Sequence, residues 1–518
     1  ALLVFVFSNG DLITAQHDAL NPDFDTTAVE IVGLIDSGLH AASWAPDEEL
    51  LAVLTKEMNL LILSRHLEPV SERVLDPNDI RVADSKHVSV GWGTEETQFK
   101  GKGFKALERE REAIRHAGLD LKEDSELRDP TVAQAQRGTV SAFDTDAAKI
   151  SWRGDCEYFA VSTKEDAVVE PAMEVIPRRV VRVFSREGEL DSVLEAADGL
   201  EHNLAWRPSG SLIASTQRCQ DEDGDDVLQV SFFERNGLRH GEFNTRLNPY
   251  EDTVLEMQWS CNSEVLACRL HDRVQVWTTK NYHWYLKQEL FVGTEKTEFI
   301  KFHPEKPLQL MVGTKSGLLM YNFAYKIASG PTVAGMDVGM TVVIDGAEAK
   351  ITPLGVANVP PPISFREYEF ESSLSDVAVN ATNDVFAMCT TTNDVFICTI
   401  SVDEMKQNKQ PHVKKIAGQS IASTGEMVKQ ICFINDSVVA VLVDTPVSSR
   451  IVLYDVTGIE VPVASSDLGA RAVLVKSRAD FTAAVAECID GSLFEISKTG
   501  EVSYLTKFPQ LCHEFEVA

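Results

Sequence analysis

The chain repeats one hydrophobic pattern, in which an aromatic residue is followed by a short polar turn and then by alternating apolar residues. Such alternation over a few residues is typical of a β-strand with one buried face. The pattern occurs as "SWAPDEELLAVLT" from residue 43, "SWRGDCEYFAVST" from 151, "AWRPSGSLIASTQ" from 205, "QWSCNSEVLACRL" from 258 and "KFHPEKPLQLMVG" from 301. We assign its aromatic residues as the signature positions of a structural repeat, namely Trp44, Trp152, Trp206, Trp259 and Phe302.

A second apolar strand follows each copy, so each unit is expected to contain several antiparallel strands. These second strands are "LLILSR" at 60, "VVRVFSR" at 180, "QVSFFER" at 229, "RVQVWTT" at 273 and "LLMYNF" at 318. The signature aromatics are 108, 54, 53 and 43 residues apart, somewhat longer than the about 40 to 45 residues of a WD40 blade, with one large insertion. The pattern predicts an all-β chain built from WD40-type β-propellers, since short sheets repeated radially bury one another's faces.

Turn signals between the strands agree with this prediction. Asn9-Gly10, Asn236-Gly237, Ser316-Gly317 and Asp490-Gly491 each separate two alternating segments. Residues that tolerate positive φ are favoured in two-residue hairpin turns, because these turns match the twist of the flanking strands. We expect β-hairpins at all four sites.

Past Gly330 the pattern weakens and then returns in three units that start near residues 376, 431 and 474. We expect a first propeller over residues 1–330, near seven-bladed, with an insertion at about 94–140, and part of a second propeller over residues 331–518. The three prolines of "ANVPPPISF" remove backbone donors, so this segment is predicted to connect the two rings at the edge of a blade.

The ends of the chain suggest a fragment. The opening hairpin "ALLVFVF" and "DLITAQ" has no aromatic turn before it, so the chain is expected to begin inside a blade. The second ring shows three clear units, whereas a closed propeller needs at least about four blades. On this pattern we expect the chain to be a fragment at both ends.

The insertion contains glycines and a charged run with helical spacing. A dinucleotide site is disfavoured, because Glu96 stands where the third glycine of G-x-G-x-x-G would be. From Lys100 to Arg115 there are six Lys or Arg and three Glu, a net of +3, in a spacing that favours an exposed helix. We predict a partner-contact segment, with a nucleic-acid patch as the alternative, and its candidate contact residues are Lys102, Lys105, Arg109, Arg111 and Arg115.

Composition narrows the class of protein. The formal charge is -31, which opposes nonspecific attraction to nucleic acid, because phosphate affinity comes largely from Lys and Arg. No apolar run is long enough to span a membrane, and no signal-peptide pattern is present. The nine cysteines lack C-x-x-C spacing and are predicted to be reduced, mostly buried thiols. We expect a cytoplasmic protein, with the nucleus as a second location.

Two segments are candidates for chemistry or binding. "QDEDGDDV" at 220 lacks the Gly and Glu that an EF-hand needs and is predicted to be a hairpin tip. "NYHWYLKQEL" at 281 could stack bases, but alternation in a strand would place two aromatics on each side, so packing against a blade and a neighbouring loop is favoured. No G-x-S-x-G or H-E-x-x-H occurs. We expect no catalytic residues, no cofactor and no metal.

Several long words identify a family that the chain resembles. "VGWGTEETQFKGKG", "SWRGDCEYFAVS", "LAWRPSGSLIAST", "VSFFERNGLRHGEF", "VQVWTTKNYHWYLKQEL" and "VVIDGAEAKITPLGVANVPPPI" resemble, in the same order, the N-terminal half of the largest subunit of the Elongator complex, known in animals as IKAP. The resemblance covers roughly residues 1–365 and thins in the second ring.

The resemblance implies a noncatalytic scaffold of two WD40 propellers in a complex that modifies carbon 5 of the wobble uridine of certain tRNAs. It implies two partners, a catalytic subunit with radical SAM and acetyl-transfer chemistry and a second WD40-repeat subunit. The family's C-terminal regions for dimerisation and tRNA binding have no counterpart in these residues, so contact with tRNA is expected to be indirect or weak. The alternatives are a direct tRNA-binding propeller module, another double-propeller scaffold, and an enzyme with its site in a propeller channel.

Overall fold

The computed structural model describes most of the chain, in segments separated by gaps. The described residues are 2–16, 29–80, 137–169, 174–221, 223–280, 282–330, 338–359, 362–416, 421–423, 425–457 and 462–512. They form two compact units, residues 1–253 and 254–518. The boundary predicted near residue 330 falls inside the second unit, so the division of the chain into propellers at that point stays a prediction.

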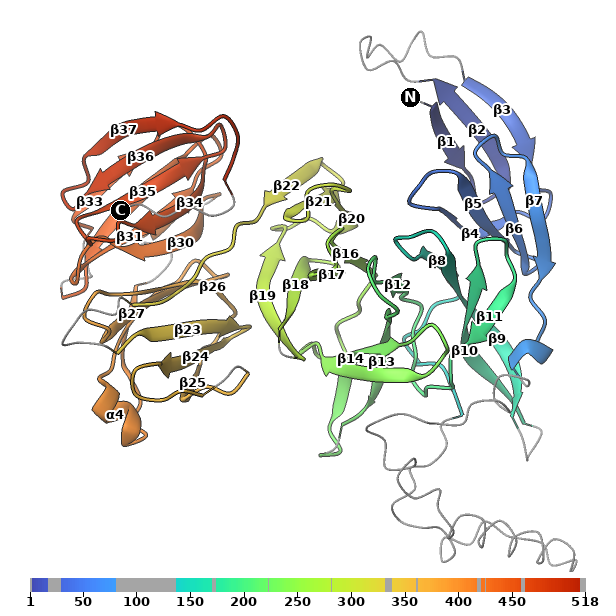
Figure 1. Ribbon diagram of the computed structural model, residues 1–518, viewed down its shortest axis with the longest axis horizontal. Coiled ribbons are helices and arrows are strands. Elements are labelled where there is room, and N and C mark those ends of the chain that lie inside the picture. Colours follow the sequence, from blue (N-terminus) through green and yellow to red (C-terminus); the bar gives the residue numbers. More distant parts are fainter. Residues whose placement is uncertain are drawn as a thin grey trace, which may run out of the picture. The chain divides into compact units, whose positions relative to one another are not determined.

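The described residues of unit 1 form four antiparallel sheets in chain order, and Figure 1 labels most of their strands. The strands are β1 (Leu2–Val6), β2 (Asp11–Gln16) and β3 (Val29–Leu34); β4 (Leu39–Trp44), β5 (Leu50–Thr55), β6 (Asn59–Ser64) and β7 (Pro69–Val74); β8 (Lys149–Trp152), β9 (Tyr158–Val169), β10 (Glu174–Ser185) and β11 (Leu190–Val193); β12 (Ala205–Trp206), β13 (Ile213–Gln220), β14 (Asp226–Phe233) and β15 (Arg239–Asn244).

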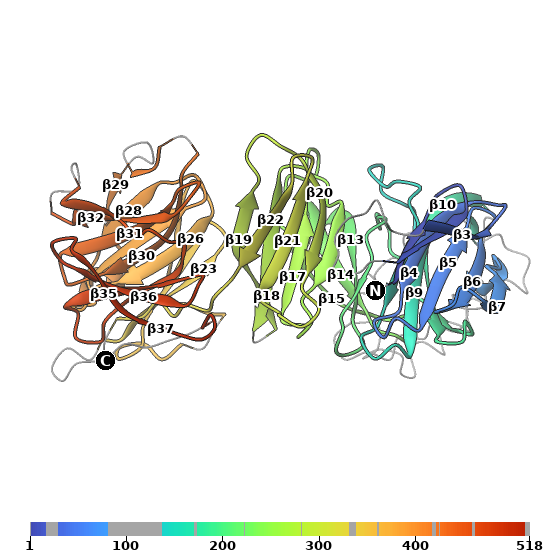
Figure 2. The same cartoon turned by 90° about the horizontal axis from the view of Figure 1, so that it is seen from above.

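Unit 2 contains six further sheets, which Figure 2 shows from above. The first three are β16 (Glu256–Trp259), β17 (Val265–Arg269), β18 (Arg273–Lys280) and β19 (His283–Phe291); β20 (Thr297–Phe302), β21 (Gln309–Thr314) and β22 (Leu318–Asn322); β23 (Met340–Asp345), β24 (Glu348–Pro353) and β25 (Arg366–Glu369). The others are β26 (Leu374–Val379), β27 (Val385–Thr390), β28 (Val395–Thr399) and β29 (His412–Ile416); β30 (Met427–Phe433), β31 (Val438–Asp444), β32 (Ser449–Asp455) and β33 (Ala464–Asp467); β34 (Ala472–Ser477), β35 (Ala483–Cys488), β36 (Ser492–Ser497) and β37 (Val502–Lys507). The short helix α4 (Val402–Lys406) follows β28.

Consecutive sheets pack face to face within each unit, which is the arrangement of propeller blades. The first strand of one sheet contacts the first strand of the next, as in β4 with β8, β26 with β30 and β30 with β34. A separate apolar cluster fills the space between neighbouring sheets, and Val439 and Val441 of β31 lie in one such cluster while Ala440 and Leu442 lie in the next. Because a middle strand is covered on both faces, its side chains are buried without alternation. The all-β propeller prediction is confirmed.

The turn predictions are also confirmed at the sites that join paired strands. The Asn9-Gly10 turn joins β1 to β2, and Gly10 has φ +103°, which a residue with a Cβ rarely adopts. A Cβ at Gly10 would lie 2.0 Å from the carbonyl oxygen of Ile35. The acidic tip of "QDEDGDDV" joins β13 to β14, where the Asp221 carboxylate accepts the backbone N–H groups of Asp223 and Asp225.

One sheet was missed, and with it the place of the proline segment. Residues 340–369 form β23–β25, although only three units were recognised past Gly330. The proline segment joins β24 to β25 inside this sheet, so the prediction that it connects the two rings is wrong. The hydrophobic pattern does not reveal this sheet, because β25 is only four residues long and a long connection separates it from β24. The backbone of Ala328 and of Gly330, which precede this sheet in the chain, already bonds to β23.

All nine cysteines lie in described segments, and none forms a disulfide. Six of them are buried, as predicted. Across the segments for which coordinates are described, we find no helix with the length and apolar character needed to cross a membrane.

Candidate functional site

The five signature aromatics occupy equivalent places in five sheets. Each is the last residue of the first strand, at the end of β4, β8, β12, β16 and β20. Trp44 is half-buried, whereas the other four are at most 7% exposed, and they are Trp152, Trp206, Trp259 and Phe302. Two of them bond to a neighbouring blade: the Trp152 indole donates to the Ser43 carbonyl at 3.0 Å, and the backbone N–H of Trp206 donates to Ser151 Oγ at 2.8 Å. These side chains are core residues of the blades.

The proposed partner-contact residues Lys102, Lys105, Arg109, Arg111 and Arg115 lie outside the described residues. The structure does describe the two chain segments that flank them. We call residues 75–80 the outgoing stem and residues 137–147 the returning stem. Both stems lie against the hairpin β9–β10, whose two strands have 12 residues each and extend beyond their neighbours β8 and β11.

Arg182 of β10 holds the outgoing stem. Its guanidinium donates to both carboxylate oxygens of Glu165, at 2.6 and 3.0 Å, and to the carbonyl of Asp76 at 3.3 Å. Its Nε lies 3.5 Å from the Asp79 carboxylate. Ile80 completes the contact by packing with Val180 in a small apolar cluster. Burial acts to raise the pKa of Glu165, but hydrogen bonding and charge from Arg182 outweigh it and hold that pKa below its usual value.

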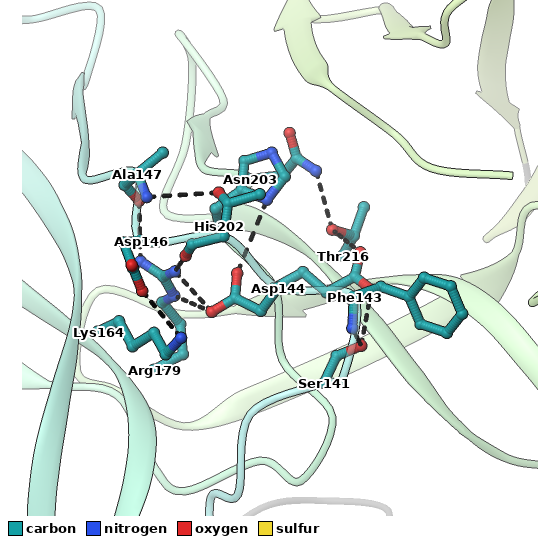
Figure 3. Close-up of polar contacts among 12 residues, drawn as sticks. Ser141, Phe143, Asp144, Asp146, Ala147, Lys164, Arg179, His202, Asn203 and Thr216 are labelled. Atoms are coloured by element: carbon teal, nitrogen blue, oxygen red, sulfur yellow. Dashed lines mark hydrogen bonds and ion pairs between the residues drawn. The ribbon is translucent and has the colours of Figure 1, made fainter.

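Arg179, on the opposite face of β10, holds the returning stem (Figure 3). Its Nε and Nη2 donate to the same carboxylate oxygen of Asp144 at 3.1 and 2.6 Å. The guanidinium also donates to the carbonyls of Thr145 and Ala147. The side chains of Arg179 and Asp144 are both 0% exposed, and His202 Nδ1 lies 3.7 Å from the second Asp144 oxygen. Side chains alternate between the two faces of a strand, so Arg179 and Arg182, three positions apart, point to opposite faces. One strand therefore reaches both stems.

A second buried ion pair, between Glu201 and Arg218, lies against the returning stem. Glu201 accepts from Arg218 Nε at 2.5 Å, from the Ser141 hydroxyl at 3.0 Å and from the Thr216 hydroxyl at 3.2 Å. The Arg218 guanidinium also lies 4.0 Å from the ring centroid of Phe143, a cation–π geometry.

The backbone of the returning stem is fixed as well. The Asp198 carboxylate accepts the N–H groups of Gly138 and Thr139 at 2.7 and 2.9 Å, and Thr139 pairs with Arg178 of β10. The returning stem is therefore an ordered strap between the sheets β8–β11 and β12–β15. These arginines and carboxylates therefore hold the backbone at the base of the insertion.

One segment of the sequence is a weak signal for this site. "RRVVRVF" places three arginines in an apolar strand, which is unusual for a buried position unless each charge is paired. Their partners could not be read from local spacing, because Asp144 is 35 residues from Arg179 and Asp76 is 106 residues from Arg182.

The segment "NYHWYLKQEL" is strand β19 and part of the packed structure. Trp284 lies against Trp259 with ring centroids 5.8 Å apart, and Tyr285 and Leu286 are both buried. The predicted alternation holds for the aromatics of the strand, because His283 and Tyr285 contact each other on one side while Trp284 contacts Trp259 on the other. Tyr282 lies before the strand and is exposed, and a register shift after Leu286 leaves Lys287 without an opposite residue. Packing against a neighbouring loop was predicted, and the loop is the turn between β23 and β24, whose Gly346 N–H donates to the Leu286 carbonyl.

Comparison with known proteins now identifies the family. A family model described as "ELP1 first N-terminal beta-propeller" matches residues 1–305, and one described as "ELP1 N-terminal second beta-propeller" matches residues 343–518. Similar curated proteins are Elongator complex protein 1 of Saccharomyces cerevisiae, 45% identical over 99% of this chain and 38% of the relative, and that of Schizosaccharomyces pombe, 33% identical over 73% and 27%. The protein of Rattus norvegicus is 33% identical over 68% of this chain and 25% of the relative. The chain thus spans less than two fifths of the length of these relatives, and it belongs to the Elongator complex protein 1 family, in the region of its two N-terminal propellers.

Proposed function

We propose that this chain is a noncatalytic scaffold region of the Elongator complex, whose reaction modifies carbon 5 of the wobble uridine of certain tRNAs. In this proposal the propellers organise a catalytic subunit with radical SAM and acetyl-transfer chemistry and a second WD40-repeat subunit. We place the assembly in the cytoplasm, with the nucleus as a second location. The observation that carries the proposal is the match of two consecutive propeller models of one Elongator subunit to residues 1–305 and 343–518.

The arrangement of the stems supports a binding role for the insertion. Both ends of the inserted segment are fixed on one strand, by Arg182 on one face of β10 and by Arg179 on the other. Rigid attachment lowers the entropy lost when a partner binds the segment between the stems. A blade needs no such anchoring for its own packing, so the buried ion pairs favour a presented contact segment over a loop without function.

A binding experiment with purified subunits tests the proposal. The tagged chain is mixed with the catalytic subunit and the second WD40 subunit, and we expect stoichiometric co-purification. Reversing the charge of the insertion at Lys102, Lys105 and Arg109 to Glu should weaken that binding. The matched control reverses the exposed Lys56, Lys306 and Lys498 to Glu and should leave binding unchanged. Failure of the wild-type chain to retain either subunit would refute the scaffold proposal.

The same preparation distinguishes a direct tRNA-binding module. Phosphate contacts release counterions, so a true tRNA site loses affinity steeply as salt rises. We expect weak tRNA binding by the chain alone, given the formal charge of -31. Tight binding that is lost when the insertion charges are reversed, without loss of the protein subunits, would favour the tRNA-binding alternative.

A further inference from the structure

Strand β19 and the turn between β23 and β24 form a polar seam inside unit 2. Gly346 N–H donates to the Leu286 carbonyl at 2.8 Å, and Leu286 N–H donates to Asp345 Oδ1 at 3.1 Å. Leu286 is thus hydrogen-bonded to both Asp345 and Gly346 of the turn. The two sides belong to different propeller matches, since β19 lies within residues 1–305 and Asp345 within residues 343–518.

Asp345 is the centre of the seam. Its side chain is 0% exposed, and its second oxygen lies 3.1 Å from His283 Nε2 of β19 and 3.5 Å from Lys350 Nζ of β24. An Asp in an Asp-Gly hairpin turn is ordinarily at a solvated tip. Here the carboxylate is buried against another sheet, where an acceptor without hydrogen-bond donors would cost folding free energy.

The bulge in β19 directs a second group across the seam. Because Val276 pairs with Gln288 and Trp277 pairs with Leu286, Lys287 is the extra residue, and a bulge re-aims such a side chain. Lys287 Nζ donates to the Ile344 carbonyl at 2.7 Å. The next two residues also bond across the seam. Gln288 Nε2 donates to the Ser375 carbonyl at 2.7 Å, and the Ser373 hydroxyl donates to the Glu289 carboxylate.

We propose that these contacts are a latch, formed by residues 283–289 on one side and residues 344–346 with 373–375 on the other. The latch holds the sheets β16–β22 and β23–β37 of unit 2 as one body, and Asp345 is its central acceptor. A partner that binds both groups of sheets therefore meets one rigid surface. This inference rests on contacts within the chain and is independent of the proposed function.

The charges around Asp345 give the latch a pH dependence. The titratable groups that face it are His283, Tyr285 and Lys287 from β19 and Lys350 from β24. Lys287 Nζ also lies 4.5 Å from the Tyr285 ring centroid, and Lys350 is itself paired with Glu348 and with Glu367 of β25. Burial lowers the pKa of Lys287 from 10.5 to about 8. Opening exposes this amine, so the open state binds more protons between pH 8 and 10.5, and the closed latch is favoured as pH rises through that window.

Hydrogen exchange on the full chain tests the latch. In Asp345→Ala, the amides of Leu286 and Gly346 should exchange at least about tenfold faster, since such local opening sets their exchange rates. Amine labelling of Lys287 should accelerate in parallel. The matched control is Glu426→Gln, which removes the ion pair at 2.8 Å between Glu426, just before β30, and Arg450 of β32; it should leave both readouts unchanged.

Two further variants keep the test decisive. If Asp345→Ala does not fold, the double variant Gln288→Leu with Ser373→Ala removes side-chain contacts across the seam without stranding a buried charge, and it should raise exchange at the same amides. Lys287→Met removes the titrating amine, so the opening of the latch should no longer depend on pH between 8 and 10.5 through this group. Unchanged exchange at Leu286 and Gly346 in a folded Asp345→Ala or in the double variant would overturn the proposal.

Discussion

The ion pair between Arg179 and Asp144 supports the sharpest stability prediction. Both side chains are 0% exposed, so Asp144→Ala leaves a buried guanidinium with only the carbonyls of Thr145 and Ala147 as described acceptors. Removing one partner of a buried pair costs about 3–5 kcal/mol. The two charge-assisted hydrogen bonds that disappear, at 3.1 and 2.6 Å, give a similar figure at about 1.5–3 kcal/mol each.

This loss should be localised to β10 and the returning stem. Hydrogen exchange in increasing urea, read on peptides covering residues 137–147 and 174–185, measures the local free energy of opening. A loss of about 3–5 kcal/mol corresponds to exchange about 10² to 10⁴ times faster, since each 1.36 kcal/mol is a factor of ten. A double variant, Asp144→Leu with Arg179→Met, should be less destabilised than Asp144→Ala, because it leaves no buried unpaired charge.

The matched control is Asp146→Asn, two residues further along the returning stem. Asp146 pairs with Lys164 at 2.9 Å but is 87% exposed, and exposed pairs contribute little to stability. It should exchange like the wild type. If Asp144→Ala also exchanged like the wild type, the returning stem would not be held by this pair, and the description of the insertion as anchored on β10 would be refuted.

Three other predictions concern a blade core, the insertion and a surface carboxylate. Trp206→Ala should destabilise unit 1 by about 3–5 kcal/mol in denaturant unfolding, since Trp206 is 3% exposed and packs with Ile213 and Phe233; an unchanged midpoint would show that the blade register is wrong. Deletion of residues 102–135, which spares both stems, should preserve the circular dichroism and the melting curve, because loop length costs little, and a collapsed fold would place the segment in a blade. Hydrogen bonds from Lys507 and Ser492 lower the pKa of Asp490 from 3.8 to about 2, so this interaction is present above pH 3.8 and is lost as pH falls through 2; carboxyl NMR titration of Lys507→Ala should find a higher pKa.

The blade cores could be predicted from sequence because their information is local. An aromatic residue, a turn and an alternating strand lie within about a dozen residues, and the structure places Trp152 and Trp206 at matching strand ends. The sheet β23–β25 escaped because its third strand lies beyond a long connection. The same limit applies to charged residues, since a strand arginine such as Arg179 indicates a surface position until its distant partner is known.

The site and the latch depend on contacts between segments remote in sequence. Asp144 reaches Arg179 across 35 residues, and His283 reaches Asp345 across 62. In β19 a single register shift leaves Lys287 without an opposite residue, and no alternation pattern predicts such a shift. The insertion was recognised from the spacing of the aromatics, whereas its anchoring on both faces of β10 required the structure.

The central claim is that these propellers are a scaffold for protein subunits. Size-exclusion chromatography with light scattering, on the purified chain mixed with the catalytic and second WD40 subunits of Elongator, tests it most directly. We predict a complex whose mass equals the sum of the chain and at least one subunit, and which survives salt that removes tRNA. Elution of the chain alone at its own mass of 57.2 kDa, with both subunits folded and free, would contradict the account.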